Sequence, residues 1–526
     1  MRKVPQKYVE AFTRGLRATA EPRNQDRLAR SYNAKPLSRG LAGWEEIPQI
    51  VGQDVVDFPF PQLLLGSEIC LIANETVLQL YNPATGNASA LATFDYTDGT
   101  TPKDIIAGGL WHWVDLGKLF MLTNGVCIVF RDNSGFDYAN PSVVKVANDV
   151  VIGTMCEWRG RVFSAGFRPT LFWKDAWKTA LEGFRDDSRV PDFLRDMSYQ
   201  LDEQFVLWST IGTSDLSFRW LLYPEESTGG FGVDVEGASW DAYPNGRTPL
   251  QEAILRNEFG MMRMPLQGKI HRILPHARGV VVYGSDGIVL LEHRMTDFST
   301  FGMEVISKEV GVAGRGAVFG DEKQHCFVDT EGTLCLLNAK GEVTVLGFQE
   351  FFKPMLSSDI VVSYNGDLYE PEFYISSPEK AFCLTTRGLG EMFQSITSVA
   401  KLGGTTACVS RNRGDLAAHI ETSDYNGGLT GLKQLCQARL VSNRDDLVGA
   451  TKLSFANGRP SIETRSRRFN PEGNLWFGDS GNDIRVLLDC TDPAGLLIER
   501  LDLEVAYIDK TSVGTIYAQE TGQSTD

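Results

Sequence analysis

Short apolar stretches separated by turn residues follow one another from about residue 60 to residue 410. They are rich in Val, Ile, Leu, Phe, Trp and Tyr, and a short apolar run bounded by Gly, Asn or Asp is typical of a β-strand. Several neighbouring stretches are joined by two-residue turns of the kind that closes a β-hairpin, as in KLFMLTNGVCIVF. The six clearest turns are at Asn74, Asn124–Gly125, Arg159–Gly160, Asp286–Gly287, Glu331–Gly332 and Asn365–Gly366, and a weaker one falls within 212–216.

The spacing of these turns predicts the architecture of the body. Most successive turns are about 35 to 50 residues apart, and the wider gap between Gly160 and Gly287 contains the weaker turn. A repeat of this length with one tight hairpin in each unit is typical of a β-propeller with four-stranded blades, so seven hairpins predict about seven blades. Two or three separate β-sandwiches would also give evenly spaced strands and remain the alternative. The polar stretch near 174–204 lacks alternation and reads as an insertion.

The pattern changes after about residue 410. DIRVLLDC and RLDLEVAYID alternate apolar and polar positions, as half-buried strands do. About one hundred residues is the usual size of a β-sandwich. We therefore expect an all-β chain in three parts: an extended N-terminal arm over 1–43, a β-propeller-like body over 44–410, and a smaller β-sandwich-like domain over 411–526.

Charge separates the first part from the rest. The first forty residues hold ten Lys and Arg against three Asp and Glu, whereas the whole chain has a net charge of −16. A body this acidic repels a nucleic-acid backbone, and a basic arm suits the acidic surface of a partner or a sister subunit. A solvated tail is the alternative. The residues expected to dock on a partner are Arg14, Arg17, Arg23, Arg27, Arg30, Lys35 and Arg39.

The sequence carries no motif for catalysis, cofactor binding or metal binding. GxSxG, the P-loop and a strand-linked GxGxxG do not occur. His271, His276 and His293 lie near one another without the spacing of a zinc motif. A second candidate, His325 with Cys326, lies on a hairpin whose side chains alternate between two faces. We therefore expect no catalytic residue, no cofactor and no metal.

The cysteines and the apolar stretches bear on the compartment. The nine cysteines are scattered, and most lie within apolar runs, where a reduced thiol acts as a small apolar side chain. No stretch has eighteen uncharged apolar residues, so we expect neither a membrane span nor a signal peptide. These features favour synthesis in a reducing cytosol.

Two segments that flank the body have a familiar pattern. The first is SYNAKPLSRGL at 31–41, directly after the polar, basic opening. The second is IETSDYNGGLTGLKQL at 420–435, which is followed by RRFNPEGNLWFGDSGNDIRVLL at 467–488. Together they resemble the tail nozzle, or tail-hub and DNA-stabilising, proteins of short-tailed bacteriophages. The resemblance covers both flanks and, loosely, the body between them.

This resemblance implies a structural protein of the virion and not an enzyme. Proteins of that family form rings, often six-fold, below the portal and its adaptor, and the genome passes through the central channel. The resemblance therefore implies that this chain contacts other copies of itself and the portal and adaptor proteins, and that viral DNA passes without specific binding. It also implies a location in the tail or neck of the virion, after synthesis in the host cytoplasm.

Two other functions remain open from the residues alone. One is a glycan-active, sialidase-like propeller hydrolase, because FRPT at 167–170 is faintly similar to the arginine-bearing segment of sialidases. The other is a propeller scaffold that binds peptides. Turnover of a sialoside or polysaccharide would distinguish the first, and a monomeric state would favour the second.

Overall fold

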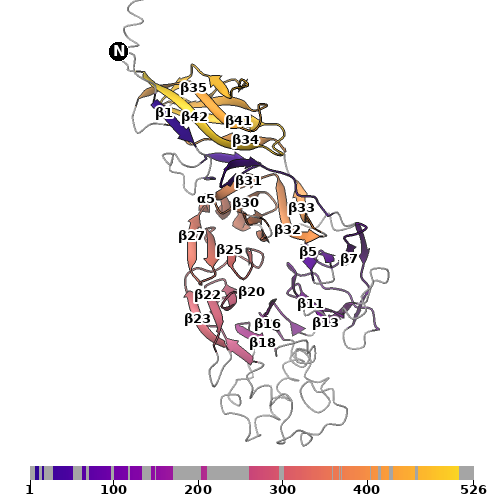
Figure 1. Cartoon of the computed structure of the whole chain (residues 1–526). Coiled ribbons are helices and arrows are strands. Elements are labelled where there is room, and N and C mark those ends of the chain that lie inside the picture. The colour runs from indigo at the N-terminus through magenta and orange to yellow at the C-terminus, as the bar shows by residue number, and fades with distance from the viewer. Residues whose placement is uncertain are drawn as a thin grey trace, which may run out of the picture.

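The computed structural model shows a chain built mainly of β-strands (Figure 1). Among the described residues, the helical elements are one short α-helix, α5 (Gln349–Phe352), and a 3-10 helix, η2 (Lys353–Ser357). No described helix has the length and apolar character needed to cross a membrane. The structure describes residues 6–10, 15–16, 28–50, 62–66, 70–95, 100–115, 119–132, 144–147, 150–166, 168–169, 203–209, 260–294, 301–357, 359–366, 368, 370–402, 404–412, 416–425, 431–455 and 460–508.

The first three sheets of the body are antiparallel, apart from one added strand. The first sheet consists of β5 (Gln62–Leu65), β6 (Cys70–Ala73), β7 (Leu78–Asn82) and β8 (Asn87–Ala90). The second consists of β10 (His112–Asp115), β11 (Leu119–Thr123), β12 (Ile128–Asp132) and β13 (Val144–Ala147), with β9 (Thr93–Asp95) parallel to β13. The third consists of β15 (Thr154–Trp158), β16 (Arg161–Ala165), β18 (Phe205–Trp208) and β19 (Gly260–Arg263). A short ribbon pairs β14 (Val150–Val151) with β17 (Arg168–Pro169).

Four further sets of strands complete the body. The fourth sheet consists of β20 (Ile270–His276), β21 (Gly279–Gly284), β22 (Ile288–His293) and β23 (Phe301–Ser307). The fifth consists of β24 (Val318–Gly320), β25 (Gln324–Val328), β26 (Leu334–Asn338) and β27 (Val343–Gly347). The sixth consists of β28 (Val361–Asn365), β29 (Glu372–Ser376), β30 (Ala381–Thr385) and β31 (Gly388–Met392). The last is the two-stranded pair β32 (Gln394–Leu402) and β33 (Thr405–Asn412).

These sheets close into a ring, as the blades of a propeller do. Neighbouring sheets share buried apolar clusters, which a flat sheet needs because it must cover its faces. In order around the ring, the shared clusters contain Leu64 and Phe120, Phe163 and Val282, Tyr283 and Phe327, Val328 and Phe382, Tyr374 and Ile396, and Ile72 and Val409. The second and third sheets meet where β10 contacts β15. The last pair packs against β5, so the ring returns to its first sheet.

The local hairpin prediction is confirmed in every place where it can be compared. Each of the six clear turns joins two antiparallel strands, and each lies in a different sheet: β6/β7, β11/β12, β15/β16, β21/β22, β25/β26 and β28/β29. The weaker turn within 212–216 and the insertion near 174–204 lie outside the described residues. Because the last pair has two strands, a count of seven complete blades stays a prediction.

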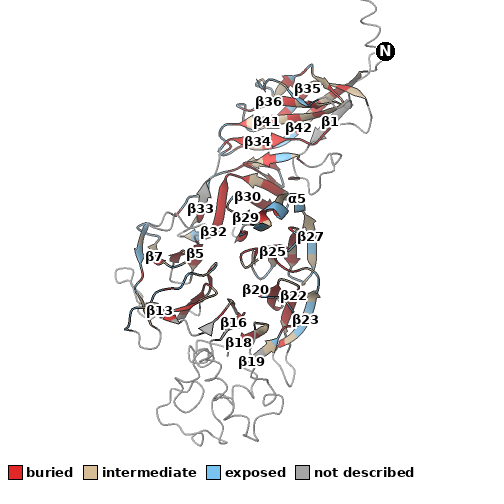
Figure 2. Ribbon diagram, turned by 180° about the vertical axis from the view of Figure 1, so that it is seen from behind, coloured by how far each residue is buried: buried red, intermediate tan, exposed pale blue. Residues whose placement is uncertain are grey.

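The C-terminal part is a β-sandwich (Figure 2). One sheet has the order β3 (Ala34–Leu37), β4 (Gly40–Gly43), β42 (Leu497–Ile508), β35 (Leu432–Ser442) and β39 (Asn474–Trp476), with β1 (Gln6–Glu10) on β42 and β40 (Ser480–Gly481) on β35. The other contains β2 (Arg30–Tyr32), β34 (Ala418–Glu421), β41 (Asp483–Cys490), β36 (Val448–Ser454), β37 (Ile462–Glu463) and β38 (Arg467–Arg468). The predicted alternation holds in β41, where Ile484, Val486 and Leu488 enter the core.

The N-terminal segment is placed differently from the free arm expected from the sequence. Strands β1 to β4 belong to the two sheets of the sandwich, and Leu28, Ala34 and Leu41 are buried in its core. The physical reason is that β42 and β34 would otherwise leave a row of backbone N–H and C=O groups without partners. Residues 30–43, from the predicted arm, and residues 418–508, from the predicted C-terminal domain, thus contribute strands to the same two sheets.

Strand β2 also joins the sandwich to the body. It pairs parallel with β31 of the sixth sheet through Tyr32 and Glu391, and antiparallel with β34 through Ser31 and Ile420. The result is a single ten-stranded sheet that runs from β28 to β37. We call the β31–β2–β34 junction the seam. Because backbone hydrogen bonds cross it, the two parts form one continuous block (Figure 1).

Candidate assembly surfaces

Asn33 fixes the seam from its centre. It is fully buried and has a left-handed backbone with φ 52°. Its Nδ2 donates to the carbonyl oxygens of Leu416 and Ala417, both at 3.0 Å, and its Oδ1 accepts from the backbone N–H of Phe393 at 2.7 Å. One side chain thus joins the N-terminal segment, the start of β34 and the end of the sixth sheet.

One described member of the predicted docking arm, Lys35, has partners inside the chain. The Lys35 Nζ pairs with the carboxylate of Glu372, which is 3% exposed, and lies 5.1 Å from the ring centre of Trp44. Burial lowers the pKa of Lys35, but the Glu372 carboxylate outweighs it, so the pKa is raised. Lys35 therefore fastens β3 to the body and does not present a free charge to a partner.

The other arm residues fall into two groups. Arg30 is exposed with its guanidinium 5.8 Å from the ring centre of Tyr32, and Arg39 is exposed in the turn between β3 and β4. For these two, docking on a partner stays a prediction. The remaining four lie outside the described residues: Arg14, Arg17, Arg23 and Arg27.

An exposed basic surface that the sequence analysis did not single out lies at one edge of the sandwich. Both sheets end there, one with β39 and the other with β37 and β38. The Arg467 Nη1 donates to the carbonyl oxygen of Trp476 at 3.2 Å, which places the two sheet edges side by side. Ile462 and Trp476 are 53% and 56% exposed. We call this surface the basic edge and define it by Ile462, Arg465, Arg467, Arg468 and Trp476, beside which the acidic Glu463 of β37 is also exposed.

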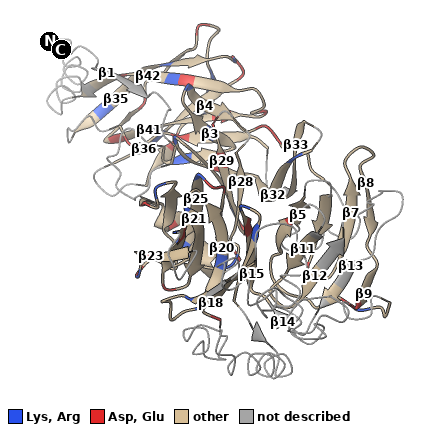
Figure 3. Cartoon of the chain, turned by 60° about the horizontal axis from the view of Figure 1, so that its bottom comes forward, with Lys and Arg blue, Asp and Glu red and all other residues tan. Residues whose placement is uncertain are grey.

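Lysines and arginines are few at the start of the body, around β5 to β9 (Figure 3). The body over 44–412 has 29 Lys and Arg against 47 Asp and Glu, and within it the stretch 44–117 has ten Asp and Glu against the single Lys103. Lys103 pairs with Asp95 at 2.5 Å. We call residues 44–117 the acidic sector. Its described surface includes the exposed Asp104 and the 46% exposed Ile106.

A cavity of about 230 Å³ lies beside the acidic sector. Segments that precede β10, β24 and β28 line it, namely 108–110, 313–317, 356–357 and 359–360, together with Glu75 of the β6–β7 turn. Because these segments lead into three different sheets, the cavity lies where several blades converge. Arg315 crosses it: Nη2 donates to the carbonyl oxygen of Thr123 at 3.0 Å.

The Asn124–Gly125 turn makes room for that arginine. Gly125 has φ +85°, and a Cβ added there would lie 2.1 Å from Arg315 Nη1. We expect Gly125→Ala to destabilise the fold by about 1 kcal/mol more than Gly86→Ala, whose φ is +72° but whose Cβ would meet nothing within 4 Å. Both variants lose roughly 1–2 kcal/mol of stability because alanine is strained in a left-handed backbone. Only Gly125→Ala must also displace Arg315, which causes the additional loss. Urea denaturation of both variants measures the difference; equal losses would show that Arg315 moves aside freely.

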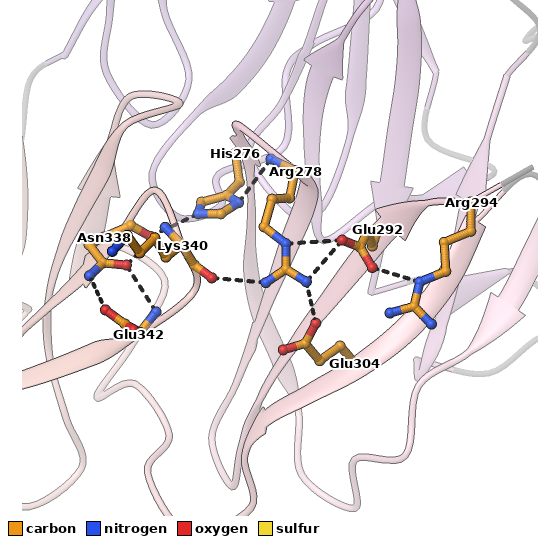
Figure 4. A network of polar contacts seen from close by, with 8 residues as sticks. All are labelled: His276, Arg278, Glu292, Arg294, Glu304, Asn338, Lys340 and Glu342. Atoms are coloured by element: carbon orange, nitrogen blue, oxygen red, sulfur yellow. Dashed lines mark hydrogen bonds and ion pairs between the residues drawn. The ribbon is translucent and has the colours of Figure 1, made fainter.

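Two of the histidines considered as metal ligands, His276 (Figure 4) and His325, make side-chain hydrogen bonds within the body. His276 Nε2 is 2.9 Å from the carbonyl oxygen of Asn338. Both ring nitrogens of His325 are also within hydrogen-bond distance of an oxygen. Nδ1 is 2.7 Å from Tyr283 Oη, and Nε2 is 2.9 Å from the carbonyl oxygen of Pro275. Burial lowers the pKa of His325 to about 4, so it is neutral at physiological pH. Within the described part of the chain, no three His, Cys, Asp or Glu residues are grouped to hold a metal ion.

Polar contacts also join neighbouring sheets of the body. Arg278 links the fourth and fifth sheets: its Nη2 contacts Glu304 at 2.5 Å and Glu292 at 2.9 Å, and its Nη1 donates to the carbonyl oxygen of Lys340 at 2.8 Å (Figure 4). The nine cysteines form no disulfide. Of FRPT, the structure describes only the backbone of Arg168–Pro169 in β17, while Phe167 and Thr170 lie outside the described residues.

Comparison with known proteins gives distant structural similarity only. No protein-family model matches the chain, and no curated protein matches it. Among solved structures it is similar to the extracellular domain of BT4673 from B. thetaiotaomicron, with 12% identity, a TM-score of 0.37 and coverage of 90% of this chain and 60% of that one. It is also similar to Raptor of Chaetomium thermophilum, with 10% identity, a TM-score of 0.33 and coverage of 71% of this chain and 28% of that one. The similarity to Hsv2 of Kluyveromyces lactis has 8% identity, a TM-score of 0.28 and coverage of 68% of this chain and 99% of that one. The chain thus spans three fifths of the first of these.

Proposed function

We propose that this protein is a non-enzymatic structural subunit of a tailed-bacteriophage virion, and that copies of it form a ring in the tail or neck. The observation that carries the proposal is the position of the two segments that resemble nozzle and tail-hub proteins. They are separated by almost 400 residues in sequence, yet Ser31 of the first pairs with Ile420 of the second, and Tyr32 pairs with His419. Both segments therefore belong to one structural feature, the seam.

The seam suits a subunit that transmits mechanical force between neighbouring subunits. A chain of two parts joined by a flexible linker bends at the linker, whereas backbone hydrogen bonds across β31, β2 and β34 hold the body and the sandwich in one sheet. The acidic body also fits a ring around DNA. Lysines and arginines on phosphate release counterions and bind, so an acidic surface lets DNA pass without adhering.

Electron microscopy of virions tests the proposal. Particles purified from the phage whose genome encodes this chain are imaged, and antibody against the chain is applied to the same particles. We expect a ring between the portal and the tail tip, with the antibody at that position and the chain present in several copies by mass spectrometry. Particles that lack the chain, or that carry it outside the tail and neck, would contradict the proposal.

A further inference from the structure

The basic edge is an open end of both sheets of the sandwich. Strands β37 and β38 pair with β36 on one side, and β39 pairs with β35 on one side, and in the described chain no strand covers their outer sides. An uncovered sheet edge is a template for contact with another chain. Such an edge therefore needs either a partner or a feature that prevents pairing.

The side chains at this edge favour a partner. Charged arginines on an edge strand can prevent unwanted pairing with another chain. This role does not explain why Ile462 and Trp476, beside the arginines, expose more than half of their surface. Among the described residues, three large apolar side chains expose more than half of their surface, and two of them lie here. Tryptophan and arginine together are the residues that carry most binding energy at protein interfaces.

The acidic sector offers the complementary surface on the same chain. Its described residues include six Asp and Glu against the single Lys103, and they also present an exposed apolar side chain, Ile106. Asp104 lies two residues before Ile106, and Glu75 is close by, because the Asn124 Nδ2 donates to the carbonyl oxygens of both Ile106 and Glu75. Charge of opposite sign and apolar contacts are therefore present on both surfaces.

From these observations we infer that the basic edge of one copy docks on the acidic sector of a second copy. Both surfaces are exposed in the single chain, so they do not satisfy each other within it. A contact between two different surfaces is heterologous, and repeated from copy to copy it closes into a ring or extends as a filament. This inference rests on the proposed function and specifies which residues make the ring contact.

Charge reversal of each surface, alone and in mixture, tests the inference with the full chain. The edge variant is Arg465→Glu/Arg467→Glu/Arg468→Glu, and the sector variant is Glu75→Lys/Asp104→Lys. The control variant, Lys323→Glu/Lys340→Glu/Lys401→Glu, reverses three exposed charges of the body and changes the net charge as much as the edge variant does. Sedimentation velocity at increasing concentration in low salt measures the association, and circular dichroism verifies folding.

We expect each reversal to weaken self-association at least about tenfold, and the control variant to associate like the wild type. An equimolar mixture of edge and sector variants should regain the wild-type association, because each reversed edge then faces a reversed sector. Trp476→Ala, which leaves all charges in place, should also weaken association about tenfold or more. Folded reversed variants that associate like the wild type, or a wild type that stays monomeric throughout, would overturn the inference. The proposed function is decided separately, by the ring in virions.

Discussion

A chain that lacks residues 2–43 is expected to lose its folded sandwich. The deletion removes β1 to β4 and three residues buried in the core, Leu28, Ala34 and Leu41. Loss of a single buried leucine side chain costs about 2–5 kcal/mol, and the newly unpaired backbone groups of β34 and β42 add to this. The sum is comparable to the whole stability of a typical domain, about 5–15 kcal/mol.

Thermal denaturation and limited proteolysis measure the outcome. We expect the deleted chain to aggregate, or to keep a protease-resistant body while the region from Ala418 to Ile508 is digested. A synthetic peptide of residues 28–43 should restore protection when added to the deleted chain, because it supplies β2, β3 and β4. A free, solvated arm would give the opposite result: the deleted chain would melt like the full one.

The second large effect is expected from Asn33→Ala. The substitution leaves the buried N–H of Phe393, the buried carbonyl of Ala417 and the part-buried carbonyl of Leu416 without this partner. Each such group costs about 1–3 kcal/mol, and alanine is also strained at φ 52°. We expect a loss of roughly 4 kcal/mol or more in the free energy of unfolding, measured by urea denaturation.

Two control variants separate the causes. Asn33→Gly relieves the backbone strain but lacks the same hydrogen bonds. It should therefore be only about 1–2 kcal/mol more stable than Asn33→Ala. Asn87→Ala removes an exposed asparagine of β8 and should change stability by less than about 0.5 kcal/mol. If Asn33→Ala resembled Asn87→Ala, the side chain would not fix the seam.

The parts of the fold that the sequence predicts are those formed between near neighbours. Each hairpin turn carries its own signal, because a tight turn favours glycine at a left-handed backbone position, as at Gly125 (φ 85°) and Gly160 (φ 75°). The alternation in β41 likewise reports burial of one face. These signals were sufficient for the all-β class, the propeller-like body and the C-terminal sandwich.

The seam could not be predicted in this way. No local pattern shows that Ser31 pairs with Ile420, since the partner of an extended strand is set by packing far along the chain. Lys35 illustrates the error: in sequence it adds to a basic run, but in the fold it lies against Glu372, a residue of the sixth sheet. Net charge of a segment describes its composition and not where its charges are neutralised.

The candidate contact surface was missed for a related reason. Arg465, Arg467 and Arg468 stand out in the sequence only as part of a resemblance, and Trp476 reads as a strand residue. Their significance depends on which strands end the two sheets, which follows from the order β36–β37 and β35–β39. A sign could have been the sequence RSRRF directly before an aromatic strand, in an otherwise acidic protein.

The pairing of the first strands with the last has a consequence for synthesis. A ribosome delivers residues 6–43 early, but β42, the strand that receives β1 and β4, leaves it almost 460 residues after β4. The propeller sheets can form in the interval from hairpins closed locally, whereas the sandwich must wait for the end of translation. The nascent N-terminus is therefore exposed to chaperones and proteases for most of elongation, and premature termination anywhere before β42 leaves a product without its sandwich.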